Sequence, residues 1–592
     1  MLLYGSQLAV GQNTVTVSYS GFTGFAASSG SVVVTVTVST AASAVVPSVV
    51  PNPVYEEDPD ADGYSWFYTV RLSEIAGVQT TLTSLSIDGN DYSSDIADWF
   101  GSTVLSANGT VSAGLRSKLK SVPTTRVFNF AGVDDSGKAW TQQISVPFYG
   151  EQLSGSMKLS SSPGTEIQNP NGDPHCDAGY PYYQQLNLQE SNGYEIHLTR
   201  FLAGGEDMTS GNWFGSWRLA PLGTLQANIC WNVTPPATLQ YEVDGVDEAG
   251  NQITTTLSVP FQAAGQSAGT LSASADSISV SAAASQSATA SVAVNVPAGQ
   301  AWSLSVFPAN QNTSWLVVYP LSGTGPSQVN LTASGAGLEN GVYTATLVFQ
   351  SVNTIPQFVN APVAFTIGAS SDVTIAAVAD GASYSTKVAP GMILSVFGQN
   401  LSPGNQGASA VPLPLDLGGV SVTVNGVAAP LYYVSPTQLD IQVPYETAAG
   451  TAVMGVNNNG KVASFSFPVQ AAAPGIFVGG DSALAGAASG PPGSSWAFYI
   501  TGQGDVTPAV GTGDPPASHS QVSDLPAPRL PVSLRVGGVP VKPLWVGIPY
   551  GLVGVTQINF TVPDNLPAGA QPVVVTIGGV DSTPGKFTVT SH

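Results

Sequence analysis

Charge is what this chain of 592 residues lacks most. Asp, Glu, Lys and Arg make up 9% of it, against roughly 25% in an average soluble protein. With a net charge of −22 and 15 Lys and Arg residues that form no runs, the chain is not expected to bind nucleic acid. No apolar run reaches the ~20 residues that span a bilayer, so no membrane span is expected.

Histidine and cysteine are also scarce, with four and two residues. There is no Gly-x-Ser-x-Gly elbow and no His-Glu-x-x-His motif, so we predict that the chain is not an enzyme. Cys176 and Cys230 are expected to form a disulfide that closes a loop of about 55 residues and contributes roughly 4 kcal/mol. Two buried free thiols are the alternative.

Acidic and histidine residues near Cys176 have side chains of the types that bind zinc. This group comprises Asp173, His175, Cys176, Asp177, Glu195 and His197. No second Cys or His stands at a spacing of two to four residues, and Cys176 has a disulfide partner available. We therefore favour the disulfide over a metal.

Glycine and proline are abundant, with 65 and 44 residues, and the apolar residues fall in short alternating runs. This pattern is typical of strands joined by many turns. Because cores stop growing near ~250 residues and Ig-type domains have about 100, we predict an all-β fold, a tandem array of Ig-like β-sandwich domains.

The C-terminal part contains a duplication. Residues 420–444 alternate up to Asn425-Gly426, a pair suited to a tight hairpin turn, and residues 532–563 repeat the pattern up to Gly537-Gly538. Both copies continue to a Thr-Gln step and end at Val-Pro.

A second duplication precedes it. Trp99-Phe100-Gly101 returns as Trp213-Phe214-Gly215, and 132–137 (GVDDSG) returns as 245–250 (GVDEAG). We predict two like sandwiches, named A1 (43–150) and A2 (151–265), each with a hairpin at the Asp/Glu-x-Gly turn.

Residues 1–42 resemble the C-terminal part of a bacterial Ig-like domain, on the alternating stretch that starts at Gly11. Forty residues cannot close such a sandwich. We expect either that the sequence is truncated or that another chain supplies the missing strands. The first residues, MLLYGSQLAVGQ, do not have the features of a secretion signal.

Residues 266–368, named domain B, resemble a BACON domain. The resemblance rests on Ser314–Gly325 (SWLVVYPLSGTG) and Gly341–Leu347 (GVYTATL). It implies an Ig-like sandwich of the kind attached to carbohydrate-active or surface proteins.

The rest of the chain resembles the Solibacter-type C-terminal domain of secreted acidobacterial proteins. We name its halves C1 (372–475) and C2 (476–592). The motifs that carry the resemblance include 379–384 (ADGASY), 389–391 (APG), 396–401 (VFGQNL), 444–446 (PYE), 473–477 (APGIF) and 501–504 (TGQG). The resemblance implies an exported protein and carries no catalytic motif.

One acidic loop has the spacing of a calcium-binding loop. Asp58, Asp60 and Asp62 are followed by Gly63, but the twelfth position is Thr69 instead of Glu. A calcium site here and a solvated acidic loop are the two alternatives. We expect no other cofactor.

Aromatic residues on one strand face are candidates for a sugar-binding platform. Tyr64, Trp66 and Tyr68 lie on one face of a strand, but that face continues as Val70 and Leu72, so we predict that it is core. The aromatic residues beside glycine are better candidates for exposed stacking surfaces that bind a ligand. They are Trp99, Phe100, Trp213, Phe214 and Trp217.

These patterns favour a secreted or cell-surface protein with an adhesive, structural or spacer role. Its expected partners are surface or matrix polysaccharide or protein, or further copies that associate by strand addition. The alternatives are the accessory region of a larger secreted hydrolase, whose catalytic domain would precede Met1, and a carbohydrate-binding protein.

Overall fold

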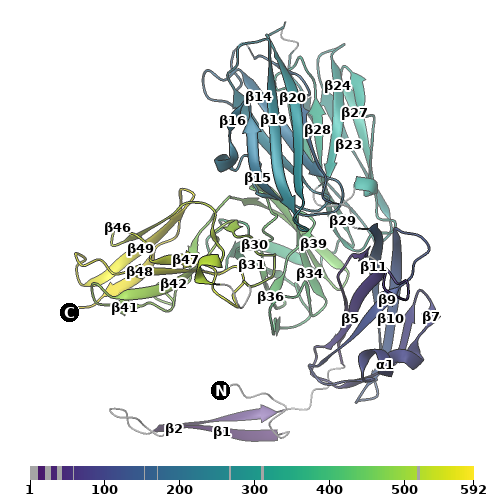
Figure 1. Cartoon of the computed structure of the whole chain (residues 1–592), viewed down its shortest axis with the longest axis vertical. Helices are drawn as coiled ribbons and strands as arrows, with labels where there is room; N and C mark the ends of the chain where they lie inside the picture. Colours follow the sequence, from purple (N-terminus) through teal and green to yellow (C-terminus); the bar gives the residue numbers. More distant parts are fainter. Residues whose placement is uncertain are drawn as a thin grey trace. The chain divides into compact units, whose positions relative to one another are not determined.

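The computed structural model describes residues 11–19, 28–36, 43–57, 59–151, 154–169, 171–265, 269–308, 313–516 and 521–591. Their regular structure is almost entirely β-strand (Figure 1), which confirms the all-β prediction. No helix in the described part of the chain is long and apolar enough to cross a membrane. The chain divides into two compact units, Met1–Leu153 and Ser154–His592.

The first unit contains a separate hairpin and domain A1. The hairpin pairs β1 (Gly11–Tyr19) with β2 (Ser28–Val36); the other residues of the expected partial Ig-like domain lie outside the described ranges. One A1 sheet has the order β3 (Val45–Val50), β5 (Trp66–Glu74), β9 (Thr110–Ser117). The other has the order β4 (Val54–Glu56), β11 (Ala139–Glu151), β10 (Thr124–Asp134), β6 (Thr80–Ile87), β7 (Asn90–Asp91), with β8 (Val104–Leu105) beside β6. The short helices η2 (Ser93–Asp95) and α1 (Ile96–Phe100) precede β8.

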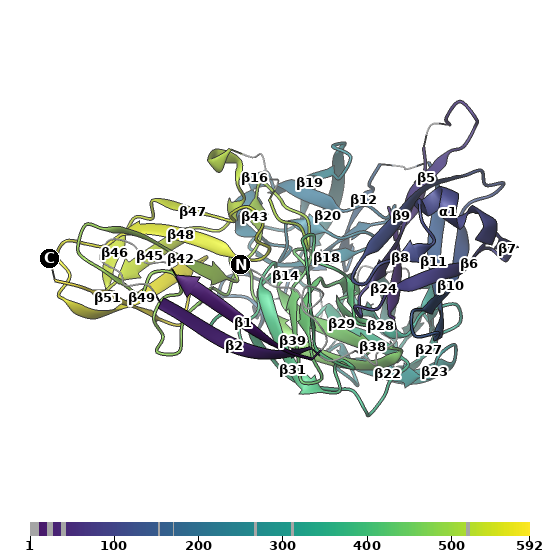
Figure 2. The same ribbon diagram turned by 90° about the horizontal axis from the view of Figure 1, so that it is seen from below.

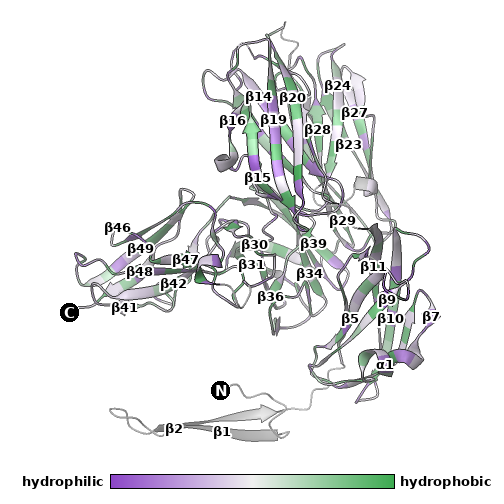
Figure 3. Ribbon diagram, viewed as in Figure 1, coloured by the Kyte–Doolittle hydropathy of each residue, from purple (hydrophilic) through white to green (hydrophobic). Residues whose placement is uncertain are grey.

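Domain A2 begins the second unit and repeats the strand order of A1. Its first sheet is β12 (Met157–Ser162), β14 (Tyr182–Glu190), β18 (Thr224–Trp231). Its second is β13 (Glu166–Ile167), β20 (Gln252–Gln262), β19 (Ala237–Asp247), β15 (Ile196–Ala203), β16 (Glu206–Asp207), with β17 (Arg218–Leu219) beside β15 and η3 (Thr209–Gly211) before it. Hydrophobic and hydrophilic residues alternate along β19 (Figure 3).

Domain B is a sandwich of four and five strands. The first sheet is β21 (Ser272–Ala273), β23 (Ser287–Asn295), β27 (Ser327–Ser334), β25 (Leu316–Tyr319). The second is β22 (Ile278–Ala282), β29 (Phe358–Ile367), β28 (Gly341–Gln350), β24 (Ala301–Pro308), β26 (Ser322–Thr324). The helix η4 (Thr313–Trp315) leads into β25.

Domain C1 also has two sheets. The first is β30 (Thr374–Asp380), β31 (Ile393–Gln399), β37 (Gln438–Gln442), β36 (Leu431–Val434), β32 (Gln406–Gly407). The second is β33 (Asp416–Leu417), β34 (Val420–Val424), β38 (Gly450–Asn458), β39 (Lys461–Val469), with β35 (Val427–Ala428) beside β34.

Domain C2, which Figure 2 shows in yellow-green to yellow, repeats this plan in its strand order. Its first sheet is β40 (Gly475–Ile476), β42 (Ser495–Thr501), β48 (Thr556–Thr561), β47 (Trp545–Gly547). Its second is β41 (Ser489–Gly490), β51 (Gly585–Val589), β49 (Gly569–Ile577), β45 (Val532–Val536), β46 (Val539–Val541), with β50 (Val580–Asp581) beside β49. A small sheet pairs β43 (Val506–Thr507) with β44 (Ala527–Pro528), and η5 (Val522–Asp524) precedes β44.

Each sandwich encloses one cluster of buried apolar side chains. In A1, Trp66, Tyr68, Val70 and Leu72 are all buried, so the aromatic face predicted to be core is core. The strands that form each pair of sheets lie within one of the predicted segments, except that β11 ends one residue after the predicted end of A1 and β40 begins one residue before the predicted start of C2. The chain is therefore a tandem array of Ig-like sandwiches.

Polar side chains connect B to both of its neighbours within the second unit. Gln357 of B donates to the carbonyl oxygen of Ile167 in A2 at 2.9 Å and accepts from the Ile167 amide at 3.1 Å. Asn340 of B donates to the carbonyl oxygen of Gly460 in C1 at 2.9 Å. Within the second unit, specific hydrogen bonds thus connect B to A2 and to C1.

Candidate functional site

The best-defined polar site is built around the side chain of Arg218, which is 2% exposed. Arg218 lies in β17, and the pairing of β17 with β15 places it opposite His197. Ser216 Oγ accepts a hydrogen bond from Arg218 N and donates one to Arg218 O, both at 3.0 Å. A guanidinium buried this deeply needs partners that offset its loss of water.

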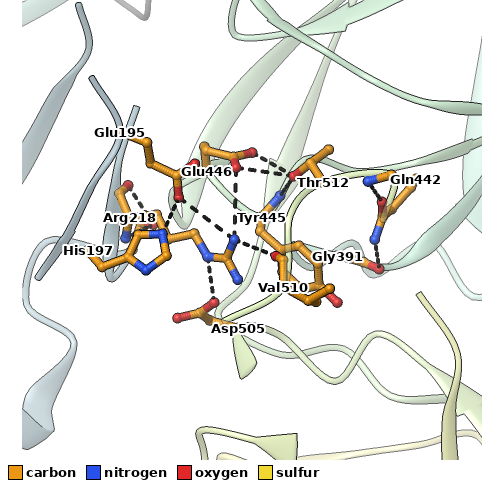
Figure 4. Close-up of polar contacts among 12 residues, drawn as sticks. Glu195, His197, Arg218, Gly391, Gln442, Tyr445, Glu446, Asp505, Val510 and Thr512 are labelled. Carbon is orange, nitrogen blue, oxygen red and sulfur yellow. Dashed lines mark hydrogen bonds and ion pairs between the residues drawn. The ribbon is translucent and has the colours of Figure 1, made fainter. Parts of the chain in front are cut away.

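Those partners come from C1 and C2 (Figure 4). Arg218 Nε donates to Asp505 Oδ1 at 2.9 Å, and Nη1 donates to the carbonyl oxygen of Val510 at 2.8 Å. The guanidinium carbon lies 4.4 Å from the centre of the Tyr445 ring, a cation–π contact. We call this the Arg218 junction. It comprises Glu195, His197, Arg218, Tyr445, Glu446, Asp505, Val510 and Thr512.

Two glutamates from different domains also face the guanidinium. Glu195 Oε1 and Glu446 Oε1 lie 3.8 and 4.0 Å from Arg218 Nη1. Burial, and then the charge of Glu195, raise the pKa of Glu446 to about 8. Burial opposes ionisation of Glu195 too, but the hydrogen bond to His197 and the charge of Arg218 outweigh it and lower its pKa. At neutral pH Glu446 therefore carries a proton, whereas Glu195 is ionised.

The carboxyl groups of both glutamates are hydrogen-bonded to other side chains of the protein. His197 Nε2 lies 2.7 Å from Glu195 Oε1, and Thr512 Oγ1 lies 2.9 Å from Glu446 Oε2. Two carboxyls whose pKa values are driven apart are typical of acid–base catalysis, but Glu446 is only 7% exposed. A substrate cannot reach its carboxyl in this arrangement. The contacts of the junction connect A2 to C1 and C2.

The loop before β17 makes further contacts with the same two domains. The Arg529 guanidinium carbon lies 4.1 Å from the centre of a Trp217 ring, and Arg529 Nη1 is 3.7 Å from Asp505 Oδ2. The amide of Ala449 donates to the carbonyl oxygen of Gly215 at 2.9 Å. Gly215 has φ +72°, and a Cβ there would lie 3.1 Å from the Ala449 backbone, so both the conformation and the close contact favour glycine.

The five aromatic residues expected to be exposed stacking surfaces differ in their surroundings. The expectation is wrong for Phe100, Phe214 and Trp217, which are buried. The two phenylalanines fill the cores of A1 and A2, and Arg529 stacks on Trp217. Trp99 is half-buried against the A1 core. Trp213 remains 39% exposed.

The predicted calcium loop is occupied in part by an arginine. Asp58 lies outside the described residues. Asp60 and Asp62 both contact Arg116, with Asp62 Oδ2 2.8 Å from Nη2, and Asp60 Oδ1 accepts the amides of Asp62 and Tyr64. Among the described residues, no three His, Cys, Asp or Glu side chains are grouped to hold a metal. A calcium site in this loop remains a prediction, and the pairing of Asp60 and Asp62 with Arg116 does not favour it.

Cys176 and Cys230 form a disulfide, with 5.7 Å between their Cα atoms. It ties the loop before β14 to β18. His175 Nδ1 lies 2.9 Å from Asp173 Oδ1, beside the three-stranded sheet, whereas Glu195 and His197 lie at the start of β15 in the other sheet. The zinc-type grouping is therefore not assembled, because its members flank different sheets.

Arg218 was missed by reasoning from the sequence, although the A1–A2 duplication contains a signal for it. The β6–β8 pairing puts Val104 opposite Thr81, where the β15–β17 pairing puts Arg218 opposite His197. A2 thus has charged or titratable residues at positions where A1 has uncharged ones. A comparison of the two repeats, position by position, would have singled out His197 and Arg218, but not their partners in C1 and C2.

A second signal was present in the C-terminal motifs. Pro444-Tyr445-Glu446 supplies two members of the junction, and Asp505 directly follows Thr501-Gly502-Gln503-Gly504. Gln503 Nε2 donates to the Tyr445 hydroxyl at 3.2 Å. A Cβ at Gly391 would lie 2.1 Å from the Tyr445 ring, which explains the glycine of Ala389-Pro390-Gly391. These motifs build the socket that receives Arg218.

No family model and no curated protein matches the chain. It is similar to the solved SGBP-B of the Bacteroides ovatus mixed-linkage glucan utilization locus in complex with a mixed-linkage heptasaccharide, at 15% identity over 53% of this chain and 65% of that chain, with TM-score 0.22. It is also similar to a three-Ig-domain titin fragment (11% identity, 54% and 98% covered, TM-score 0.14) and to a bacterial ice-binding adhesin (13%, 56% and 99%, TM-score 0.15). With TM-scores this low, the similarities carry no argument about function.

Proposed function

We propose that this protein is a secreted or cell-surface multidomain Ig-like protein with a structural or spacer role, in which A2, B, C1 and C2 act as one docked block. The observation that carries the proposal is the Arg218 junction. It attaches A2 to C1 and C2, although B lies between them in the sequence. A linear array of independent domains would have no such contact.

The chemistry of the junction supports a role in fixing orientation. A buried ion pair adds little net stability, because desolvation offsets its attraction, but leaving one partner unpaired costs several kcal/mol. A misaligned A2 would separate the buried Arg218 from Asp505 of C2 and leave both charges unpaired. The junction therefore disfavours other placements of A2, as a rigid spacer requires.

Export is supported by the disulfide. Disulfides persist in oxidising compartments and are rare in the cytosol of mesophiles. Cys176 and Cys230 are the chain's two cysteines and they are bonded to each other. We propose no catalytic role for the acids and the histidine of the junction, because they are shielded as described above.

The docked block is tested with the full chain and the variant Arg218→Val, which introduces the residue that A1 has at this position. We expect small-angle X-ray scattering to show a larger radius of gyration for the variant and limited proteolysis to show new cleavage between A2 and its neighbours. The control is Arg535→Val, because Arg535 pairs with Asp581 on the surface of C2. Identical scattering for wild type and Arg218→Val would contradict the block.

Export is tested separately in cells that produce the protein. We expect externally added protease to cleave it on intact cells, or the protein to appear in the medium, with Cys176 and Cys230 protected from thiol alkylation. Protein retained in the cytosol with both thiols reactive would refute export and leave the docked block unaffected.

A further inference from the structure

The most exposed large apolar side chains of domain B lie in one row. Val317, Tyr319 and Leu321 are 63%, 73% and 51% exposed. Val317 and Tyr319 alternate with the buried residues of β25 and therefore share its outward face, and Leu321 follows beyond Pro320 in a bend. Leu316 and Val318, the alternate residues of β25, belong to the buried core of B.

The strand that carries this row is at the edge of its sheet. β25 is the last strand in the order β21-β23-β27-β25, so no described strand pairs with its outer side. In an antiparallel pair, alternate residues direct their N–H and C=O groups away from the partner strand. Edge strands are commonly protected by charged side chains, but Leu316–Tyr319 contains none. The outer edge is open to pairing with another strand.

Charge is absent from a long stretch around this strand. No charged residue lies between Asp276 and Glu339, although the chain as a whole has a net charge of −22. Copies of a strongly acidic protein repel one another, so close approach of two copies is favoured where the surface is uncharged. β25 lies within this uncharged stretch.

We propose that β25 is a self-association site, at which the strand pairs edge to edge with β25 of a second copy. An antiparallel, two-fold pair centred on Val318 places Val317 of each copy opposite Tyr319 of the other. Aromatic and β-branched residues form favourable cross-strand pairs, and the symmetry provides this pair twice. This inference goes beyond the proposed function, since it holds wherever the protein acts.

The ends of the strand limit the contact. Pro320 follows Tyr319 and has no N–H to donate, so the ladder stops there in both copies. A two-fold contact of this kind is closed and gives a dimer instead of a filament. Because the paired segment is short, we expect a weak, reversible dimer of the kind formed by small interfaces.

The test is sedimentation velocity of the full chain over a wide concentration range, in 0.15 M salt to screen its net charge. We expect a reversible dimer for wild type and a dissociation constant on the order of tenfold higher for Val317→Lys, because the cross-strand pair is lost twice and two like charges are added. The matched control is Leu544→Lys, a site in C2 that is 61% exposed. Wild-type and variant melting temperatures should agree, because Val317 is on the surface.

The register is tested by mixing a Val317→Cys chain with a Tyr319→Cys chain under mild oxidation. We expect a disulfide-linked heterodimer to form faster than either homodimer, because the proposed register places these positions opposite each other. Wild type that stays monomeric at all concentrations, or a dimer unchanged by Val317→Lys, would overturn the proposal. A monomer that binds a neutral polysaccharide through Val317 and Tyr319 would also overturn it. The same holds for cross-linking that shows no preference for the heterodimer over the two homodimers.

Discussion

Replacing Glu446 with glutamine tests whether the Arg218 junction depends on a single proton. Burial and the charge of Glu195 raise the pKa of Glu446 from an ordinary 4.5 to about 8. A carboxyl with a raised pKa stabilises the docked state fully below pH 4.5 and loses this contribution as the pH rises through about 8. At about 1.4 kcal/mol for each pKa unit, the docked state weakens by up to about 5 kcal/mol over that interval.

The other groups that face Glu446 do not cancel this slope. Glu195 has a lowered pKa, so its contribution is complete above its ordinary pKa and is lost only as the pH falls. Burial raises the pKa of Tyr445, so it stays neutral. Arg218 stays cationic, because burial lowers its pKa but the charges of Asp505 and Glu195 outweigh this and raise it. Between pH 6 and pH 8, Glu446 therefore accounts for a loss of about 2 kcal/mol in the stability of the docked state.

Glutamine has nearly the shape of the protonated carboxyl but does not ionise. Differential scanning calorimetry of the full chain at pH 6 to pH 9 should show a transition that falls with pH in wild type and stays level in Glu446→Gln. The transition is identified as the one that Arg218→Val lowers, because several domains unfold in one scan. The control is Glu339→Gln, an exposed carboxyl in B. Parallel pH profiles for wild type and Glu446→Gln would refute the assigned proton.

Three further predictions follow from the described contacts. Arg218→Lys keeps the charge but loses the guanidinium that donates to both Asp505 and Val510, so urea denaturation should show a loss of unfolding free energy on the order of 2 kcal/mol. An unchanged denaturation midpoint would show that the charge alone suffices. The double variant Cys176→Ser and Cys230→Ser should lower the unfolding free energy of A2 by about 4 kcal/mol, and a circular dichroism melt indistinguishable from wild type would contradict this. The Ser136 hydroxyl and the amide of Lys138 hold the pKa of Asp134 at about 2, so A1 should lose stability as the pH falls from 4 to 2 and Asp134→Asn should lose less, as acid titration by circular dichroism will show.

Local patterns were sufficient to predict the fold. The pair Asn425-Gly426 has φ +49° and +83° and joins Val424 to Val427 in a two-residue hairpin, as its sequence predicts. Gly537-Gly538 has φ +59° and +80° and connects β45 to β46 in the same way. Both turns depend only on adjacent residues and on alternation in the flanking strands.

The junction depends on contacts that no local pattern encodes. Arg218 and Asp505 are separated by 287 positions in the sequence. Alternation predicts which face of a strand is buried in its own sandwich, but a loop such as the one before β17 has no period of 2 or 3.6 residues to interpret. Trp217 was expected to be an exposed ring for this reason, and the domain that covers it could not be foreseen.

The comparison of A1 with A2 shows that the sandwich itself does not require an arginine at the position of Arg218. The carbonyl oxygen of Thr103 in A1 accepts the amide of Leu82, and the carbonyl oxygen of Trp217 in A2 accepts the amide of Leu198. The two loops therefore have the same backbone pairing. Val104, next to Thr103, is 40% exposed. A valine at position 218 is therefore compatible with the sandwich itself. It follows that Arg218→Val should separate A2 from C1 and C2 while A2 stays folded, which distinguishes a docking residue from a core residue.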